Sequence, residues 1–260
     1  MIKENNFYNL YKKEDVIQQK KGEHPYYQAI GRIFMSKLLK HEVVSKILEI
    51  GLIPVFYNEA FEIAKNIVES CLEGGAKVVE FTNRGDFAFN VFSKLSKWCK
   101  QEHPNIILGA GTIIDQGTAS IYINCGANFI VGPLFNAEIF KICNRRKVAY
   151  IPGCQTLSEI SAAEEMGADI VKIFPAKVLT PSFIESILGA CPYSTLLVSG
   201  GVEATREDIF RWIRAGAKAL NIGSNLIREH AFRTGDFKEI RNGVEQCILW
   251  IKEAREELIS

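Results

Sequence analysis

The stretch Gly167-Ala168-Asp169-Ile170-Val171-Lys172-Ile173-Phe174-Pro175-Ala176 contains the two patterns that predict the fold and its chemistry. It opens with a glycine at which a helix is expected to end, because glycine readily takes the left-handed conformation of a helix C-cap. One residue after the Gly-Ala pair an apolar run begins, which predicts a short buried strand ended by proline. Within that run lies a single lysine, Lys172. The stretch therefore predicts a helix-to-strand connection that carries an amine on the strand.

The same connection occurs four times in the chain. Each copy has Gly-Ala, one further residue and an apolar strand, and the copies begin at Gly75, Gly126, Gly167 and Gly216. They lie roughly 40–50 residues apart, about the length of two strand–helix units. Further apolar runs lie before and between the copies. Together they predict eight strands that alternate with amphipathic helices and start near Leu52, Val78, Ile106, Phe129, Val148, Ile170, Leu196 and Ala219.

Strands this uniformly apolar are typical of a parallel sheet covered by helices. Eight strand–helix units predict an α/β fold, a single (β/α)8 TIM barrel over residues 35–260. Helices are expected at Ser36–Ile50, before the first strand, and at Phe237–Ile259. Residues 1–34 hold no regular period and are expected to form an N-terminal extension, partly helical or flexible. An open, doubly wound sheet is the alternative, although no Gly-x-Gly-x-x-Gly loop follows the first strand.

Composition narrows the class of protein. The 260 residues are 47% hydrophobic and carry a net charge of +1, so the charge gives no reason to expect a nucleic-acid or membrane partner. The seven cysteines are scattered without metal-ligand spacing, which suits reduced thiols. No apolar run approaches the ~18 residues of a membrane span, and the N-terminus lacks the apolar core of a signal peptide. We expect a soluble, cytoplasmic protein.

The reacting groups of such barrels lie at the carboxyl ends of the strands. Lys172 is either an edge lysine that reaches solvent or an amine kept partly neutral so that it can form a Schiff base. Glu80 follows two valines and is either a structural carboxylate or the proton shuttle that such an amine needs. Arg84 is either a surface arginine or a bidentate hydrogen-bond donor to a substrate carboxylate. Their occurrence on strand ends of one barrel favours the catalytic alternative for all three.

Two glycine turns point to phosphate. Gly200-Gly201 ends the seventh strand and allows backbone N–H groups to approach a ligand, and Gly223-Ser224 adds donors at an expected helix start after the eighth. The loops after these two strands are the usual phosphate-binding site of the fold. The four histidines lie away from the strand ends, so neither a zinc-type metal site nor a histidine base is expected: His24, His41, His103 and His230.

These motifs, in this order, resemble the class I aldolases that cleave 2-keto-3-deoxy-6-phosphogluconate (KDPG) and 4-hydroxy-2-oxoglutarate (KHG). The resemblance covers about residues 45–235. It rests on Val79-Glu80-x-Thr82-x-Arg84, Gly109-Ala110-Gly111-Thr112, Ile151-Pro152-Gly153-x-x-Thr156, Lys172-x-Phe174-Pro175-Ala176, Ser199-Gly200-Gly201 and Ile222-Gly223-Ser224. It implies a lyase of the Entner–Doudoroff pathway, without metal or organic cofactor, that assembles as a homotrimer and acts on a small keto-acid phosphosugar.

The resemblance also implies a role for each residue. Lys172 forms the Schiff base and Glu80 is the general acid and base. The remaining roles fall into three groups: Arg84, Thr112 and Ser199 hold the pyruvyl carboxylate, Phe174 and Pro133 pack beside the imine, and Gly200, Gly201, Gly223 and Ser224 bind the phosphate.

Three loops depart from the family pattern. The family commonly has Leu-Arg-Thr, Ser-Pro-Gly and Thr-Gly-Gly where this chain has Asn83-Arg84-Gly85, Gly132-Pro133-Leu134 and Ser199-Gly200-Gly201. Because these loops line the expected substrate entrance, two alternatives stay open. One is an aldolase for another 2-keto-3-deoxy sugar acid, such as the phosphogalactonate isomer, and the other is a non-catalytic phosphosugar-binding barrel.

Overall fold

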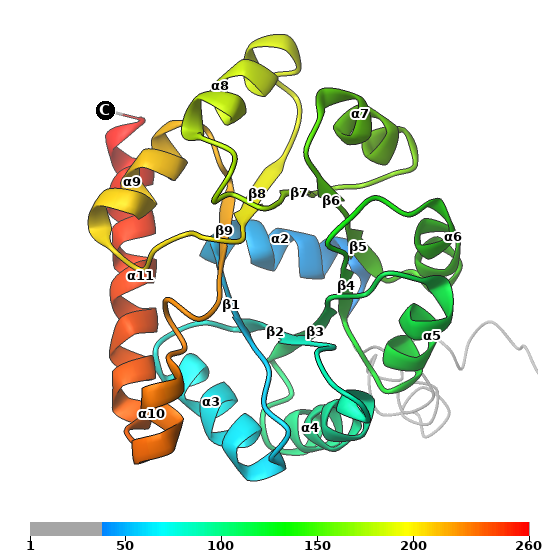
Figure 1. Ribbon diagram of the computed structural model, residues 1–260, viewed down its shortest axis with the longest axis vertical. Helices are drawn as coiled ribbons and strands as arrows, with labels where there is room; N and C mark the ends of the chain where they lie inside the picture. The colour runs from blue at the N-terminus through cyan, green and yellow to red at the C-terminus, as the bar shows by residue number, and fades with distance from the viewer. Residues whose placement is uncertain (1–37, 260) are drawn as a thin grey trace, which may run out of the picture. The chain divides into compact units, whose positions relative to one another are not determined.

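The computed structural model describes residues 38–259. The expected extension over residues 1–34, and its boundary with the barrel, lie outside the described residues. The described part alternates strands and helices (Figure 1). Its elements are α2 (Lys40–Ile50), β1 (Leu52–Phe56), α3 (Phe61–Glu73), β2 (Val78–Thr82), α4 (Ala88–Glu102), β3 (Ile107–Gly111), α5 (Gln116–Asn124), β4 (Phe129–Val131), α6 (Ala137–Arg146), β5 (Ala149–Ile151), β6 (Gly153–Cys154), α7 (Leu157–Glu165), β7 (Val171–Ile173), α8 (Pro181–Ala190), β8 (Leu196–Ser199), α9 (Arg206–Arg214), β9 (Ala219–Ile222), α10 (Glu229–Thr234) and α11 (Phe237–Glu257).

All pairs of neighbouring strands are parallel, in the order β5-β4-β3-β2-β1-β9-β8-β7-β6. The two ends of this order, β5 and β6, are consecutive pieces of the predicted fifth strand, divided at Pro152. Proline has no N–H for the ladder, but its carbonyl still accepts a 2.9 Å bond from the Lys172 N–H. The sheet therefore returns on itself through Pro152 as a nearly closed barrel, which confirms the predicted (β/α)8 fold and excludes the open sheet.

The four Gly-Ala connections are confirmed as helix ends. Gly75, Gly126, Gly167 and Gly216 have positive φ angles of 94°, 99°, 91° and 108°. A side chain at such an angle is strained, whereas glycine is not. In each copy the next strand begins two or three residues after the alanine, so this short motif marks four helix-to-strand junctions.

Helix α2 closes the amino-terminal end of the barrel, crossing behind the strands in Figure 1. Val43 and Ile47 from this helix are buried against residues inside the barrel, among them Ile53, Phe129 and Leu197. The predicted helix start at Ser36 lies outside the described residues. Leu38 and Leu39 are not helical, because Glu42 accepts a 2.6 Å bond from the Leu39 N–H and starts the helix at Lys40.

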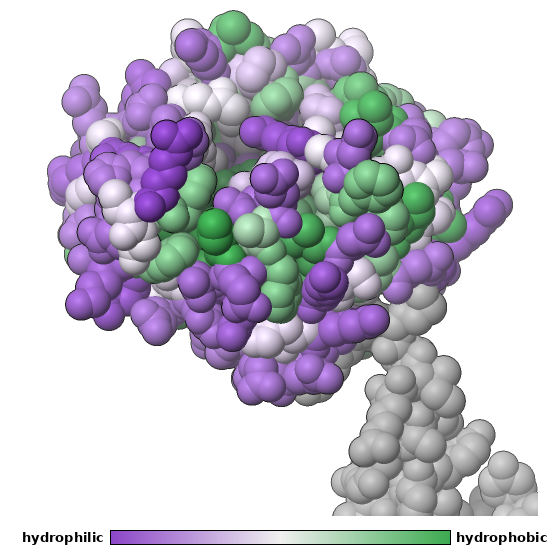
Figure 2. Space-filling view, turned by 60° about the horizontal axis from the view of Figure 1, so that its bottom comes forward, coloured by the Kyte–Doolittle hydropathy of each residue, from purple (hydrophilic) through white to green (hydrophobic). Residues whose placement is uncertain are grey.

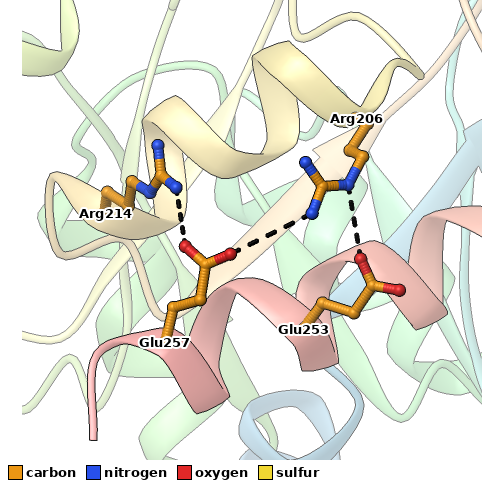
Figure 3. A network of polar contacts seen from close by, with 4 residues as sticks. All are labelled: Arg206, Arg214, Glu253 and Glu257. Carbon is orange, nitrogen blue, oxygen red and sulfur yellow. Dashed lines mark hydrogen bonds and ion pairs between the residues drawn. The ribbon is translucent and has the colours of Figure 1, made fainter. Parts of the chain in front are cut away.

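The outer helices bury the other face of each strand. Helix α11 ends at Glu257, two residues before the predicted end at Ile259, and packs against α3 and α9. Figure 3 shows the ion pairs that join α9 to α11: Arg206 contacts Glu253 (3.4 Å) and Glu257 (4.0 Å), and Arg214 contacts Glu257 (2.6 Å). Over residues 38–259 no helix has the length and apolar character that crossing a membrane requires.

Candidate active site

One cavity of about 810 Å³ contains every site residue predicted from the sequence. Its wall is formed by the carboxyl ends of the strands and the loops that follow them. The predicted residues on that wall are Glu80, Arg84, Thr112, Pro133, Lys172, Phe174, Ser199, Gly200, Gly201, Gly223 and Ser224. They come from six strands and the loops that follow them (β2, β3, β4, β7, β8 and β9), and closure of the barrel brings these distant parts of the sequence together.

Lys172 is the middle residue of β7 and is only 5% exposed. Its neighbours Val171 and Ile173 belong to the core beneath the outer helices, while Lys172 itself lines the cavity. Its ammonium nitrogen, Nζ, lies 4.6 Å from the centre of the Phe174 ring. The alternative of an edge lysine that reaches solvent is therefore wrong.

Burial lowers the pKa of Lys172 below that of a free lysine. Glu80 opposes the shift by favouring the charged ammonium, and Arg84 adds to the shift by repelling it. An amine with a lowered pKa has a larger neutral fraction near neutral pH, and only the neutral amine can attack a carbonyl carbon. The environment of Lys172 thus favours the neutral form of the amine, which is the form that a nucleophile requires.

Glu80 lies in the centre of β2 and is 1% exposed. Its carboxylate lies over Gly111 of β3, where any β-carbon would overlap Oε1. Burial raises the pKa of Glu80, and three groups oppose that rise: the charge of Lys172, a hydrogen bond from Asn221, and the charge of Arg84. A carboxyl whose pKa is raised towards neutrality can both accept and return a proton.

Asn221 is a site residue that the sequence reasoning left without a role. It lies in β9, is buried, and its Nδ2 donates a 2.7 Å hydrogen bond to Oε2 of Glu80. Its Oδ1 accepts a 2.8 Å bond from the hydroxyl of Ser199 on β8. The sequence could have identified it, because Asn221 is a polar residue within the apolar run Ala219-Leu220-Asn221-Ile222, just as Glu80 is within its own strand.

Arg84 and Thr112 lie on the same wall. Arg84 follows β2, is exposed, and forms no ion pair with any residue of 38–259. Thr112 follows β3 with a φ of 60°, a left-handed conformation that is strained for a β-branched residue and costs about 1–3 kcal/mol. Strain of this kind is typical of functional turns. The two residues place a cation and a hydroxyl at the cavity edge.

The Gly200-Gly201 turn also depends on left-handed backbone, with φ angles of 84° and 108°. A β-carbon on Gly200 would lie 2.7 Å from the Phe174 ring, and one on Gly201 would lie 2.7 Å from Cβ of Lys177. Lys177 is a second residue that the sequence reasoning missed. It lines the cavity, donates its N–H to the Gly200 carbonyl (2.7 Å), and has no ion-pair partner within the described residues.

The prediction that a helix starts at Ser224 is wrong. Residues 224–227 form a turn instead, in which the N–H groups of Leu226 and Ile227 both donate to the Gly223 carbonyl at 2.9 Å. Helix α10 begins only at Glu229. Ser224 is nevertheless exposed on the cavity wall beside Gly223, so the turn still offers a hydroxyl and backbone donors to an anion.

Within residues 38–259, no three His, Cys, Asp or Glu side chains converge in the way a metal ion requires. The cavity combines instead a buried amine, a buried carboxyl, and unpaired cations at its rim. An amine that attacks a ketone and a carboxyl that moves protons are the groups required for Schiff-base chemistry on a keto acid.

Proteins with similar sequences carry related names. A 2-dehydro-3-deoxy-phosphogluconate aldolase of Treponema pallidum (strain Nichols) is 28% identical over 193 residues, 74% of this chain and 89% of that protein. A 2-dehydro-3-deoxy-6-phosphogalactonate aldolase of Escherichia coli (strain K12) is 30% identical over 155 residues, 58% of this chain and 69% of that protein.

Solved structures agree on the fold. The KDPG aldolase from Legionella pneumophila, with pyruvate captured at low pH as a covalent carbinolamine intermediate, superposes with a TM-score of 0.70 at 24% identity. The match covers 80% of this chain and 97% of that one. The family described as KDPG and KHG aldolase matches residues 43–243. With its barrel and the residues of its cavity, this chain belongs to the KDPG and KHG aldolase family.

Proposed function

We propose that the protein is a class I aldolase that splits 2-dehydro-3-deoxy-6-phosphogluconate into pyruvate and glyceraldehyde 3-phosphate. The observation that carries this proposal is the buried Lys172, whose amine lies within the electrostatic reach of the buried Glu80. A barrel that only binds phosphosugars has no need of a desolvated amine, since an exposed lysine binds an anion without the cost of burial.

The reaction follows from the two groups. The neutral amine of Lys172 attacks the keto carbon, and loss of water with uptake of one proton from solvent leaves a protonated imine. The imine accepts the electron pair of the breaking carbon–carbon bond, while Glu80 takes the proton of the neighbouring hydroxyl, directly or through a water. The aldehyde leaves, Glu80 returns a proton to the resulting enamine, and water releases pyruvate and restores Lys172.

The ends of the substrate are assigned by charge. Arg84 and Thr112 hold the carboxylate next to the keto group, because they place a cation and a hydroxyl on the wall of the cavity that Lys172 and Glu80 line. The phosphate belongs at Gly200, Gly201, Gly223 and Ser224, and Lys177 supports this assignment because it places an unpaired cation beside the first glycine turn. Phe174 and Pro133 cover the imine. Ser199, also predicted to join the carboxylate site, lines the same cavity and donates its hydroxyl proton to Asn221.

The phosphogalactonate isomer is a second candidate substrate. It differs in the configuration of a hydroxyl group, and the similar Escherichia coli protein is named for its activity on this isomer. KHG, which would yield pyruvate and glyoxylate, lacks the phosphate that Lys177 and the glycine turns would bind. Initial rates with the three acids, and with dephosphorylated KDPG, rank these substrates.

Borohydride reduction with pyruvate tests the chemistry. We expect an adduct of about 72 Da on Lys172, identified by mass spectrometry of the digested protein. Lys172→Met is expected to abolish it, whereas Lys177→Ala, which removes the other lysine of the cavity, is expected to retain it. An adduct on a peptide without Lys172, or none at all, contradicts the proposed mechanism.

We further propose that the protein assembles as a homotrimer in the cytoplasm. Figure 2 shows hydrophobic side chains gathered in the middle of one face and surrounded by hydrophilic ones. Phe87, Ile114 and Leu134, which follow β2, β3 and β4, are 71%, 54% and 45% exposed. Exposed apolar residues on three neighbouring loops favour burial against another copy. Light scattering of the protein and of Phe87→Asp tests this assembly: a trimer that the substitution weakens supports it, and a monomer contradicts it.

A further inference from the structure

Asn221 joins two side chains that belong to different parts of the site. It donates to Glu80 on β2 and accepts from Ser199 on β8. Strand β1 lies between β2 and β9 in the sheet, so the carboxylate of Glu80 and the amide of Asn221 meet inside the barrel and across β1. The three polar side chains are all buried, with exposures of 1%, 3% and 5% for Glu80, Asn221 and Ser199.

The direction of each bond is set by chemistry. An ionised carboxylate can only accept, so with Glu80 ionised the amide turns its Nδ2 towards Glu80 and its Oδ1 towards Ser199. The Ser199 hydroxyl completes the arrangement because it can donate to that oxygen. A buried carboxylate without a donor strongly favours its protonated form, and a donor within hydrogen-bond distance favours the ionised form.

We propose that Asn221, held by Ser199, is a positioning residue that keeps the Glu80 carboxylate in place and ionised for proton transfer. The inference rests on the proposed function for its catalytic meaning. The hydrogen bond between the Asn221 amide and the Glu80 carboxylate does not depend on that function. Ser199 acts through Asn221 in this arrangement.

The charged groups that face Glu80 are few. Lys172 on β7 and Arg84 after β2 both favour the carboxylate. The paired neighbours of Glu80 on the adjacent strands, Val55 of β1 and Gly109 of β3, carry no charge. Asn221 is the uncharged donor in this set. Replacing Asn221 leaves Lys172 and Arg84 in place. A change in the titration of Glu80 in that variant is therefore assigned to the lost hydrogen bond.

The first experiment needs no substrate. Carboxyl carbons of glutamate are labelled with ¹³C, and the Glu80 signal is identified as the one missing in Glu80→Gln. In Asn221→Leu we expect the pKa of Glu80 to lie about one unit or more above that of the unchanged protein, because the donor that favours the carboxylate is gone. Asn221→Ala, which is smaller and easier to accommodate, is expected to shift it in the same direction. An unchanged Glu80 pKa in the folded variants overturns the proposal.

The second experiment follows pyruvate. Exchange of its methyl protons with solvent requires both the imine and the base, whereas borohydride trapping requires only the imine. In Asn221→Leu we expect trapping on Lys172 to persist, exchange at neutral pH to fall about tenfold or more, and the acid limb of the exchange profile to move to higher pH. Ser199→Ala is expected to move the limb in the same direction by less, and to add nothing to Asn221→Leu.

Asn128→Leu is the matched control. Asn128 accepts a 3.0 Å bond from the Leu108 N–H before β4 and does not line the cavity. Its loss is expected to lower the melting temperature without moving the acid limb. A profile that moves equally in this control, or trapping lost with exchange in Asn221→Leu, would show a structural role for Asn221 alone. If the unchanged protein traps no pyruvate, the proposed function fails, and the labelled titration still decides the role of Asn221.

Discussion

Three residues of the site, Glu80, Lys172 and Asn221, are polar side chains within otherwise apolar strands, and each is at most 5% exposed. Burial of such groups is costly unless each finds a partner. Here Asn221 satisfies the carboxylate of Glu80 by a direct hydrogen bond, and Glu80 and Lys172 moderate each other's pKa shifts through their opposite charges. At the residue scale, the burial that costs free energy also shifts the pKa values of Glu80 and Lys172, which is what the proposed chemistry requires.

Glu80→Gln separates the imine from the proton transfer. The amide has nearly the shape of the carboxylate but cannot act as a base, so we expect pyruvate trapping on Lys172 to continue. Exchange of the pyruvate methyl protons is expected to fall by roughly two to four decades. Proton NMR in deuterated buffer measures it. Unchanged exchange removes Glu80 from the mechanism.

Lys177→Ala tests the phosphate end. Lys177 lies beside the Gly201 turn and has no ion-pair partner in the described residues, so its loss is expected to raise the KM for the phosphorylated substrate about three- to thirtyfold. The dephosphorylated substrate and the pyruvate exchange rate are expected to change little. Lys238→Ala, an exposed lysine of α11 outside the cavity, is the control. Equal effects on both substrates contradict a phosphate contact.

At the scale of the elements, the helices differ in how they are held. Helix α2 inserts apolar side chains into the end of the barrel, whereas α9 and α11 are joined additionally by exposed ion pairs (Figure 3). Apolar burial contributes far more to stability than exposed charge pairs, which gain little in water. The amino-terminal closure by α2 is therefore expected to be more sensitive to substitution than the charged surface.

The comparison of Ile47→Ala with Arg214→Ala measures that difference. Ile47 is fully buried, and its truncation is expected to lower the free energy of unfolding by about 2–5 kcal/mol. Arg214 pairs with Glu257 on the surface, and its truncation is expected to cost less than about 1 kcal/mol and to matter less in high salt. Urea denaturation gives both values. Equal losses would mean that α2 does not pack as the structure shows.

At the scale of the whole molecule, the cysteines report on folding. Five of the seven are buried, and burial raises their pKa, to about 12 for Cys99, Cys143, Cys154 and Cys247. Cys71 is shifted in the same direction. Cys125 and Cys191 are only half-buried. Since thiolates are the reactive form, the five buried thiols are inert in the folded protein.

A thiol titration with an aromatic disulfide is therefore expected to show two reactive cysteines in the native protein and seven in denaturant. Cys125→Ser and Cys191→Ser are each expected to remove one native equivalent. Rapid reaction of more than two thiols before denaturation would contradict the burial of the core cysteines.

The local pattern of the chain determined the order of its elements. The Gly-Ala pairs set the helix ends because the conformational freedom of glycine is a local property, confirmed by the positive φ angles of all four glycines. The short apolar runs located the strands, because the alternation of apolar and polar segments is also read from the local sequence. In a parallel barrel the carboxyl ends of all strands meet at one face, so Lys172, Glu80 and Arg84 could be assigned to one cavity before any contact was known.

Contacts between distant strands were decided by the tertiary structure alone. The hydrogen bond between Asn221 and Glu80 joins residues 141 positions apart, and no local preference specifies it. The sequence by itself therefore determined the barrel and its polar strand residues. Closure of the barrel decided which of those residues touch, because only packing brings together side chains that the chain keeps apart.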